Sequence, residues 1–243
     1  MKKPYVIIHT HTSLEGKIHA INLPEFEAAS QQYQEIALDP EKQVMNIQCY
    51  LNGRITVEDN FTHYRKPELN EQADTVPEGD FIAVTDAPNY FVAIDRSGKL
   101  AWTDNVVEYG NVKSHVISIL TEQVSNAYKD FLRRMNVSYI IAGEKDIDQE
   151  LVLHKLSTLY NVERLMIGGG GILNWSYLQN GLVDEVSIIM SPIADGSTDE
   201  QSLFAAKEHL SKVSPVAFEL MEVKTLEESV VWLQYKVKPS YKS

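Results

Sequence analysis

Short apolar runs alternate with amphipathic segments along most of the chain, and this alternation predicts strands followed by helices. Strands are predicted where apolar and β-branched residues cluster, at 5–11, 44–51, 81–85, 90–95, 114–120, 137–142, 164–167 and 185–190. Helices are predicted at 25–38, 125–136, 148–160 and 172–180, the first entered through Pro24 and the last stopped by Gly181. The pattern is typical of an α/β fold with a mostly parallel sheet and helices on both faces.

The end of the chain has a different pattern. Residues 217–226 and 229–238 are predicted to be two strands joined by an acidic turn, which makes an antiparallel hairpin. The polar stretch 62–79 is predicted to be a loop, and neither half of the chain looks complete without the other. We therefore expect a single domain over residues 1–243.

Composition and charge narrow the class of partner. Apolar residues make up 44% of the chain and charged residues 23%, which is ordinary for a globular domain. Asp and Glu outnumber Lys and Arg by 34 to 22, a net charge of −12 that repels nucleic acids and anionic lipid. Cys49 is the only cysteine, which suits a reducing compartment, and no apolar run approaches the ~18 residues of a membrane span. We expect a cytoplasmic protein that binds a small molecule, with no nucleic-acid or membrane partner.

Four consecutive glycines, Gly168, Gly169, Gly170 and Gly171, follow the predicted strand 164–167 and precede the predicted helix that begins at Ile172. Such a run is costly in backbone entropy, and a tight turn needs fewer glycines. Amide groups at a helix N-terminus suit a phosphate, so we favour phosphate binding over a plain turn. The spacing is not the dinucleotide fingerprint, and no P-loop lysine follows.

A second candidate phosphate junction follows the predicted strand 44–51. Gly53 and Arg54 form a turn whose guanidinium can grip phosphate oxygens, and Thr56 can cap a helix or donate to a phosphate. Two such junctions fit a dinucleotide better than a mononucleotide. Thr121, just past its strand, offers a further hydroxyl to the cofactor or, alternatively, caps a helix.

His9 and His11 lie at alternate positions of the first predicted strand and so share one face. This run resembles the first-strand motif of the PHP metallo-phosphoesterase family, and a metal-dependent phosphoesterase is one alternative. Ala87, however, stands where that family has a metal-binding histidine, and two histidines alone are too few for a multinuclear site. We expect no bound metal and read His11 as an ordinary strand-end residue.

A second resemblance covers more of the chain. Residues 4–9 leading to Ser13-Leu14-Glu15-Gly16-Lys17-Ile18 resemble the opening strand and loop of the riboflavin-biosynthesis reductase domain (the RibD C-terminal domain). Gly53-Arg54-Ile55-Thr56 is similar to the Gly-Arg-x-Thr turn of dihydrofolate reductase-like proteins, and residues 57–60 to the reductases' segment ending in Asp-Asn-Pro. Residues 165–178 and 181–196 are similar to the family's glycine loop with its helix and to the Gly-Leu-Val-Asp-Glu run after it.

The resemblance implies a dihydrofolate reductase-like fold, a homodimer, and an enzyme that transfers hydride from NADPH to a phosphoribosylaminopyrimidine of riboflavin biosynthesis or to a pterin. It implies that both glycine junctions hold the dinucleotide phosphates and that the Ser13–Ile18 loop lies near the nicotinamide and substrate. The residues expected to bind cofactor are Gly53, Arg54, Thr56, Thr121, Gly168, Gly169, Gly170, Gly171 and Ile172. Those expected to bind substrate are His9, Ser13 and Arg65, the last through a substrate phosphate.

Reduction of a C=N bond is helped by protonation of the nitrogen, so a carboxylic acid is the expected proton donor. Glu15 and Asp59 are the candidates, and a solvated loop carboxylate is the alternative for each. Gly168 stands where the family's glycine loop has a glutamate linked to pyrimidine recognition. This difference from the family bears on which substrate is bound more than on whether hydride is transferred. A nucleotide-binding protein without turnover is a further alternative.

Overall fold

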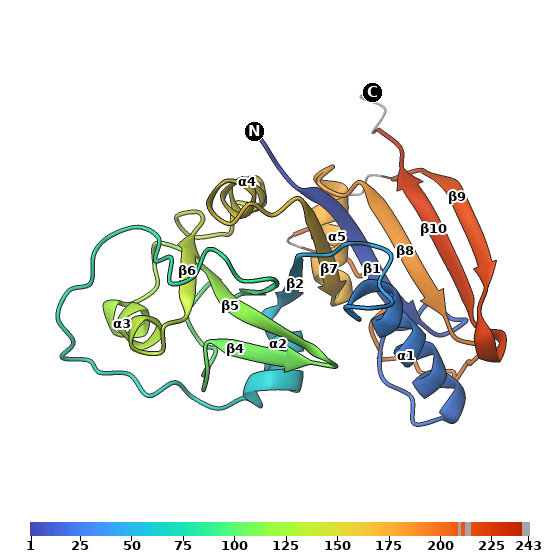
Figure 1. Ribbon diagram of the computed structural model, residues 1–243, viewed down its shortest axis with the longest axis horizontal. Helices are drawn as coiled ribbons and strands as arrows, with labels where there is room; N and C mark the ends of the chain where they lie inside the picture. Colours follow the sequence, from blue (N-terminus) through green and yellow to red (C-terminus); the bar gives the residue numbers. More distant parts are fainter. Residues whose placement is uncertain (209, 212–214, 240–243) are drawn as a thin grey trace. The chain divides into compact units, whose positions relative to one another are not determined.

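The computed structural model describes residues 1–208, 210–211 and 215–239 (Figure 1). The chain divides into two compact units, and each is described by itself. The first unit holds residues 1–4 and 48–165, and the second holds residues 5–47 and 166–243. The single domain expected over the whole chain stays a prediction. Within the described residues, no helix combines the length and apolar character that crossing a membrane requires.

The first unit is built on a largely parallel sheet. Its strands are β2 (Cys49–Gly53), β3 (Tyr90–Ile94), β4 (Val106–Tyr109), β5 (Val112–Leu120) and β6 (Ser138–Ile141). β2, β3, β5 and β6 pair in parallel in that order, and β4 pairs antiparallel with the first half of β5. All but one of the β5 residues are buried, as expected of a parallel strand that is covered on both faces.

Two helices of the first unit begin after residues whose side chains cap them. α3 (Asn126–Arg134) starts after Ser125, whose side chain accepts a hydrogen bond from the Tyr128 amide. α4 (Gln149–Leu159) starts after Asp148, which accepts from the Leu151 amide in the same way. A short helix, α2 (Arg54–Val57), continues directly into a π-helical turn, η1 (Glu58–Thr62).

The second unit carries the strand order β7-β1-β8-β10-β9. The strands are β1 (Tyr5–Thr12), β7 (Arg164–Gly169, of which residues 166–169 belong to this unit), β8 (Glu185–Met190), β9 (Phe218–Thr225) and β10 (Val231–Val237). β1 and β8 are parallel, whereas β10 runs antiparallel to both β8 and β9. α1 (Pro24–Ala37) packs against β1 and β8, and α5 (Gly171–Gln179) follows β7; the turn η2 (Glu227–Ser229) joins β9 to β10.

The α/β class, the mostly parallel pairing and the C-terminal antiparallel hairpin are therefore confirmed. The strand predicted at 81–85 is wrong, because only Phe81 exchanges backbone hydrogen bonds with Tyr139, and the next available amide, that of Ala83, donates to the Ser138 hydroxyl instead. The strand predicted from residue 44 begins only at Cys49, and β4 and the helical turns at 54–62 were not predicted.

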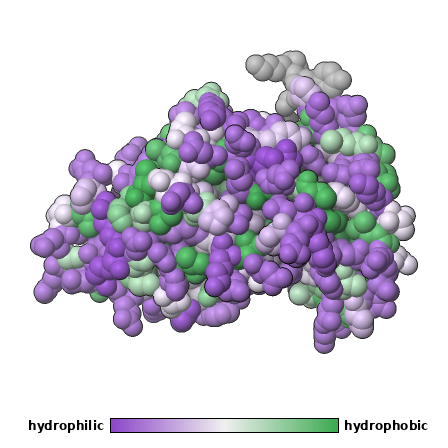
Figure 2. Space-filling view, in the orientation of Figure 1, coloured by the Kyte–Doolittle hydropathy of each residue, from purple (hydrophilic) through white to green (hydrophobic). Residues whose placement is uncertain are grey.

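The surface agrees with the composition. Figure 2 shows hydrophilic side chains over most of the visible face. The edge strand β9 is an exception, since Leu220, Met221 and Val223 are each more than half exposed.

Candidate functional site

The glycine loop of the second unit has backbone that only glycine adopts easily. Gly169, the last residue of β7, has a φ of +100°, in the region that side chains with a Cβ rarely adopt. A Cβ added to Gly171 would lie 2.2 Å from the Ser202 carbonyl oxygen, so this residue has no room for a side chain. At Gly170 the neighbour is the end of the flexible Gln201 side chain, 2.9 Å from an added Cβ. The peptide bond between Gly169 and Gly170 is cis.

The start of α5 presents backbone donors. Gly170 is the N-cap, and the described residues provide no side-chain hydrogen bond that caps the helix. The first bond within the helix runs from the Asn174 amide to the Gly170 carbonyl (3.0 Å), so the amides of Gly171, Ile172 and Leu173 precede it. Uncapped amides and the helix dipole together suit an anion. This junction can hold a phosphate.

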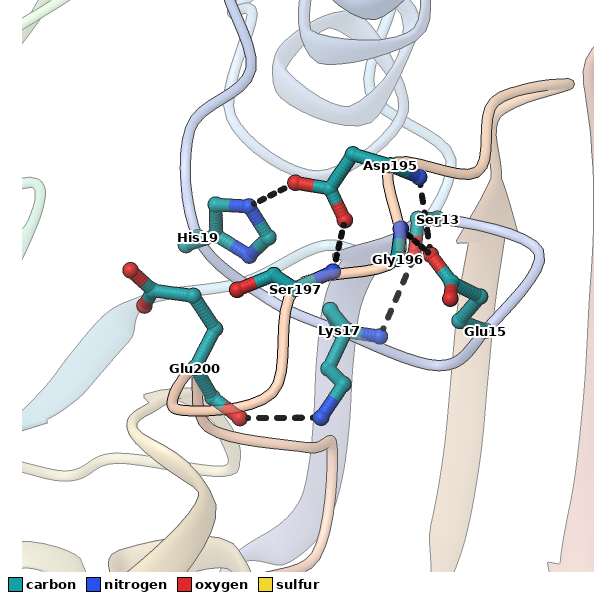
Figure 3. Close-up of polar contacts among 8 residues, drawn as sticks. All are labelled: Ser13, Glu15, Lys17, His19, Asp195, Gly196, Ser197 and Glu200. Carbon is teal, nitrogen blue, oxygen red and sulfur yellow. Dashed lines mark hydrogen bonds and ion pairs between the residues drawn. The ribbon is translucent and has the colours of Figure 1, made fainter.

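In the second unit, hydrogen bonds join the loop after β1 to the loop after β8 (Figure 3). The Glu15 carboxylate accepts hydrogen bonds from the amides of Asp195 (2.9 Å) and Gly196 (3.2 Å). Asp195 in turn pairs with His19 at 2.7 Å, and its hydrogen bonds to the Ser197 amide and His19 hold the pKa of its carboxyl below the usual value. Glu15 therefore joins two loops, and the catalytic role expected of it stays a prediction.

The same loop holds Ser13 and Lys17. The Ser13 side chain is fully buried, and its hydroxyl accepts from the Lys17 amide at 3.3 Å. The Lys17 ammonium donates to the Glu200 carbonyl at 3.1 Å. The Ser13 hydroxyl therefore helps to shape the loop, and the substrate contact expected of it stays a prediction.

His9 lies in the core of the second unit with both ring nitrogens hydrogen-bonded. Nε2 faces the Tyr33 carbonyl (3.1 Å), which can only accept, so Nε2 carries the proton. Nδ1 then accepts from the Ser187 hydroxyl (2.9 Å), and the Ser187 oxygen accepts from the Trp232 indole (2.8 Å). Burial lowers the pKa of His9 to about 4, so the ring is neutral at pH 7. If His9 contacts the substrate as predicted, at least one of these hydrogen bonds must break.

The metal alternative receives no support from the geometry. His11 packs on Phe26 with ring centroids 4.2 Å apart, and burial lowers its pKa to about 4. Across the described part of the chain, no three His, Cys, Asp or Glu side chains are grouped as metal ligands. His9 and His11 share a face as predicted, but α1 covers that face rather than a metal.

The second junction lies in the first unit. Gly53 is the N-cap of α2 with a φ of −74°, which any residue adopts. Arg54 forms an ion pair with Glu58 one turn later, and Glu58 is buried. Glu58 was not predicted from the sequence, although a spacing of four residues on a helix is the signal for such a pair. The guanidinium keeps further donors for a phosphate.

The remaining predicted residues of the first unit lie in or just after its helical turns, Thr56 in α2, Asp59 in η1 and Arg65 in the loop that follows. Asp59 is exposed and accepts from the Tyr64 hydroxyl, an interaction that raises the pKa of Tyr64. Arg65 is also exposed, and its Nε donates to the Thr62 carbonyl at 3.0 Å. The carbonyl of Thr56 accepts from the Asn60 side chain, and the half-buried Thr56 hydroxyl has no hydrogen bond among the described residues.

Thr121 uses its hydroxyl within the chain. Its Oγ1 donates to the Arg96 carbonyl at 2.8 Å, and the residue is 1% exposed. This bond ties the residue after β5 to the turn after β3, and Ser125 rather than Thr121 caps α3, so the helix cap predicted as one role of Thr121 is wrong. The cofactor contact stays a prediction.

Comparison with known proteins places these features in a family. The model of the RibD C-terminal domain matches residues 4–232. A 2,5-diamino-6-ribosylamino-4(3H)-pyrimidinone 5′-phosphate reductase of Methanothermobacter thermautotrophicus is 33% identical over 105 residues, 43% of this chain and 48% of that protein. This match spans about half the length of the relative. The reductase of the same name from Aquifex aeolicus is 23% identical over 212 residues, 84% of this chain and 83% of that protein.

Solved structures share the fold. RibD of Acinetobacter baumannii superposes with a TM-score of 0.61 at 18% identity, covering 97% of this chain and 58% of that one. A pyrimidine reductase-like protein of Corynebacterium diphtheriae gives 0.64 at 13% identity, covering 98% and 93%. The riboflavin biosynthesis reductase Rib7 of Saccharomyces cerevisiae gives 0.56 at 15% identity, covering 97% and 90%. The fold class expected from the sequence resemblance is confirmed.

Proposed function

Because the chain belongs to the RibD C-terminal domain family, we propose that it is an NADPH-dependent reductase acting on a phosphorylated ribosylaminopyrimidine of riboflavin biosynthesis. The preferred substrate is the one named for the two reductases reported above, 2,5-diamino-6-ribosylamino-4(3H)-pyrimidinone 5′-phosphate. A uracil-type intermediate or a pterin is the next substrate to test, because Gly168 replaces the family glutamate that is linked to pyrimidine recognition.

The observation that carries the proposal is the junction of β7 and α5. Gly169 has a positive φ, and α5 begins without a side-chain cap among the described residues. These features fit the diphosphate of a dinucleotide, which needs close backbone approach and a row of amide donors. The bound cofactor supplies the hydride, and the protein supplies binding and orientation.

Several of the predicted residues have a defined part in the proposal. The amides at the start of α5 bind phosphate oxygens, and Arg54 contributes a guanidinium to a cofactor phosphate. Arg65 binds the substrate phosphate. Asp59 is the better candidate for proton donor, because its exposed carboxylate accepts one hydroxyl, whereas the Glu15 carboxylate accepts two backbone amides.

The oligomeric state is also a proposal. We expect a homodimer, which light scattering of the purified protein measures. The three exposed apolar residues on the edge strand β9 support an interface there, since such edges favour association.

Purified protein tests the proposal in two steps. Calorimetric titration with NADPH comes first, and turnover follows as loss of NADPH absorbance with the diaminopyrimidinone substrate, its uracil analogue and a dihydropterin in parallel. We expect NADPH binding and turnover of one pyrimidine. Binding without turnover of any substrate would favour a nucleotide-binding protein, and absence of NADPH binding would overturn the proposal.

A further inference from the structure

Residues 201–205, called the strap below, lie against the loop that follows β1. The Ile18 amide donates to the Gln201 carbonyl at 3.0 Å, and the Leu203 amide donates to the Gly16 carbonyl at 2.9 Å. The loop donates in the first bond and the strap donates in the second, and both bonds join backbone atoms. The Ser13–Ile18 loop is therefore fixed from the side of the strap.

The other side of the strap lies against the glycine loop. The Ala205 amide donates to the Gly171 carbonyl at 3.1 Å. The strap passes so close to Gly171 that an added Cβ would lie 2.2 Å from the Ser202 carbonyl oxygen. One short segment thus contacts both the first turn of α5 and the Ser13–Ile18 loop.

Asn174 anchors the strap from inside the helix. It is fully buried in the first turns of α5, and its Nδ2 donates to the Leu203 carbonyl at 2.9 Å. Because a carbonyl only accepts, this contact requires a donor and fixes the orientation of the amide. The backbone of Leu203 consequently bridges the two elements, with its amide on Gly16 and its carbonyl on Asn174.

The buried Asn174 side chain does not maximise the stability of the fold. Its Oδ1 is buried and has no hydrogen-bond partner among the residues that the structure describes. An unsatisfied buried acceptor destabilises a protein, and an apolar residue of similar size would avoid the cost. The polar side chain is better explained by what its donor holds in place. A Cβ added to Gly169 would lie 4.0 Å from Nδ2, so the same amide also lies beside the glycine loop.

We infer that Asn174 is a positioning residue that couples the cofactor junction to the Ser13–Ile18 loop through Leu203. A phosphate bound at the start of α5 fixes the first turn and Asn174 with it. Asn174 then holds the strap, and the strap holds Gly16 and Ile18 in the arrangement that faces the substrate. This inference rests on the proposed binding of NADPH at the β7–α5 junction.

Hydrogen–deuterium exchange of the peptide covering residues 13–18 tests the coupling without relying on turnover. In the wild-type protein, NADPH should slow exchange of this peptide by about fivefold or more, at the lower end of typical couplings between sites. In Asn174→Ala and Asn174→Leu, the slowing should fall below about twofold while NADPH still binds. The two variants differ in volume, so a shared result isolates the lost donor.

Leu178→Ala is the matched control. Leu178 is buried on the same helix, and its truncation destabilises α5 without removing a donor to the strap. It should keep the wild-type response to NADPH. The inference is overturned if the Asn174 variants keep the response, if Leu178→Ala loses it equally, or if wild-type protein binds NADPH without protection of the peptide. If the wild-type protein does not bind NADPH, the proposed function itself fails.

Discussion

In the second unit, β7 ends in glycines and leads into α5, a helix of nine residues. In the first unit, β2 ends at Gly53 and leads into α2, a helix of four residues that continues as η1. Both junctions lack a side-chain N-cap. They differ in what the glycine does: Gly169 needs a φ of +100°, whereas Gly53 has a φ of −74°.

The difference shows two ways of preparing a strand-to-helix turn for an anion. The β7–α5 junction depends on backbone, because its glycines allow close approach and its amides are uncapped. The β2–α2 junction depends on the charge of Arg54, part of which the buried Glu58 already balances. Substitutions at the first junction should therefore act through shape, and those at the second through charge.

The largest expected effect is a difference in the free energy of unfolding between an alanine substitution at the first junction and one at the second. Gly171→Ala places a Cβ against the Ser202 carbonyl oxygen, and the backbone must move, which typically costs about 1–3 kcal/mol of the free energy of unfolding. Gly53→Ala needs no change of backbone conformation, and replacing an N-cap glycine by alanine should cost less than about 1 kcal/mol. Urea denaturation of both variants measures the difference, and equal losses would contradict this view of the junctions.

Gly170→Val tests the shape of the first junction without unfolding the protein. The nearest atom to the added Cβ is the end of the Gln201 side chain, which can rotate away. The branched side chain would nevertheless cover the amides at the start of α5. NADPH affinity should fall at least about tenfold, equivalent to about 1.4 kcal/mol. If a folded Gly170→Val variant keeps its NADPH affinity in calorimetric titration, the glycine loop does not bind phosphate and serves only as a tight turn.

Sequence patterning predicted the elements on both sides of the glycine loop because local signals agree there. An apolar run precedes the glycines, a helical stretch follows, and Gly181 ends it. Such signals mislead at 81–85, where a β-rich run makes only one bridge. The π-helical turn at 58–62 carries no hydrophobic period that would reveal it. The type of an element is thus predictable where the hydrophobic pattern agrees with the residues that begin and end the element.

The site is less predictable than the fold, because partners come from distant parts of the chain. Motif position identified Glu15 as a candidate, but its acceptor role toward the amides of residues 195 and 196 depends on the loop after β8. Asn174 was not identified, since a single asparagine in a helix carries no signal without the strap it contacts. Residue type indicated the possible chemistry, and only the folded chain showed which groups are already engaged.

The smallest expected effect concerns the charge at the second junction. Arg54 is about one-third exposed and shares its guanidinium with Glu58, so screening and competition limit what it gives to a phosphate. Arg54→Ala should weaken NADPH binding about three- to tenfold, less than the full contribution of a charge-assisted hydrogen bond. NADH binding should fall less, if the guanidinium contacts the 2′-phosphate that NADH lacks.

Glu58→Gln provides the opposite change at the same pair. It removes the negative charge that the guanidinium is paired with, so NADPH affinity should be kept or should rise, while NADH affinity stays constant. The preference for NADPH should shrink as salt rises, because the contact is accessible to ions. Equal losses of both cofactors in Arg54→Ala would place the residue on the shared diphosphate or in a structural role. No loss of either would remove Arg54 from cofactor binding, and the comparison would then rest on the β7–α5 junction alone.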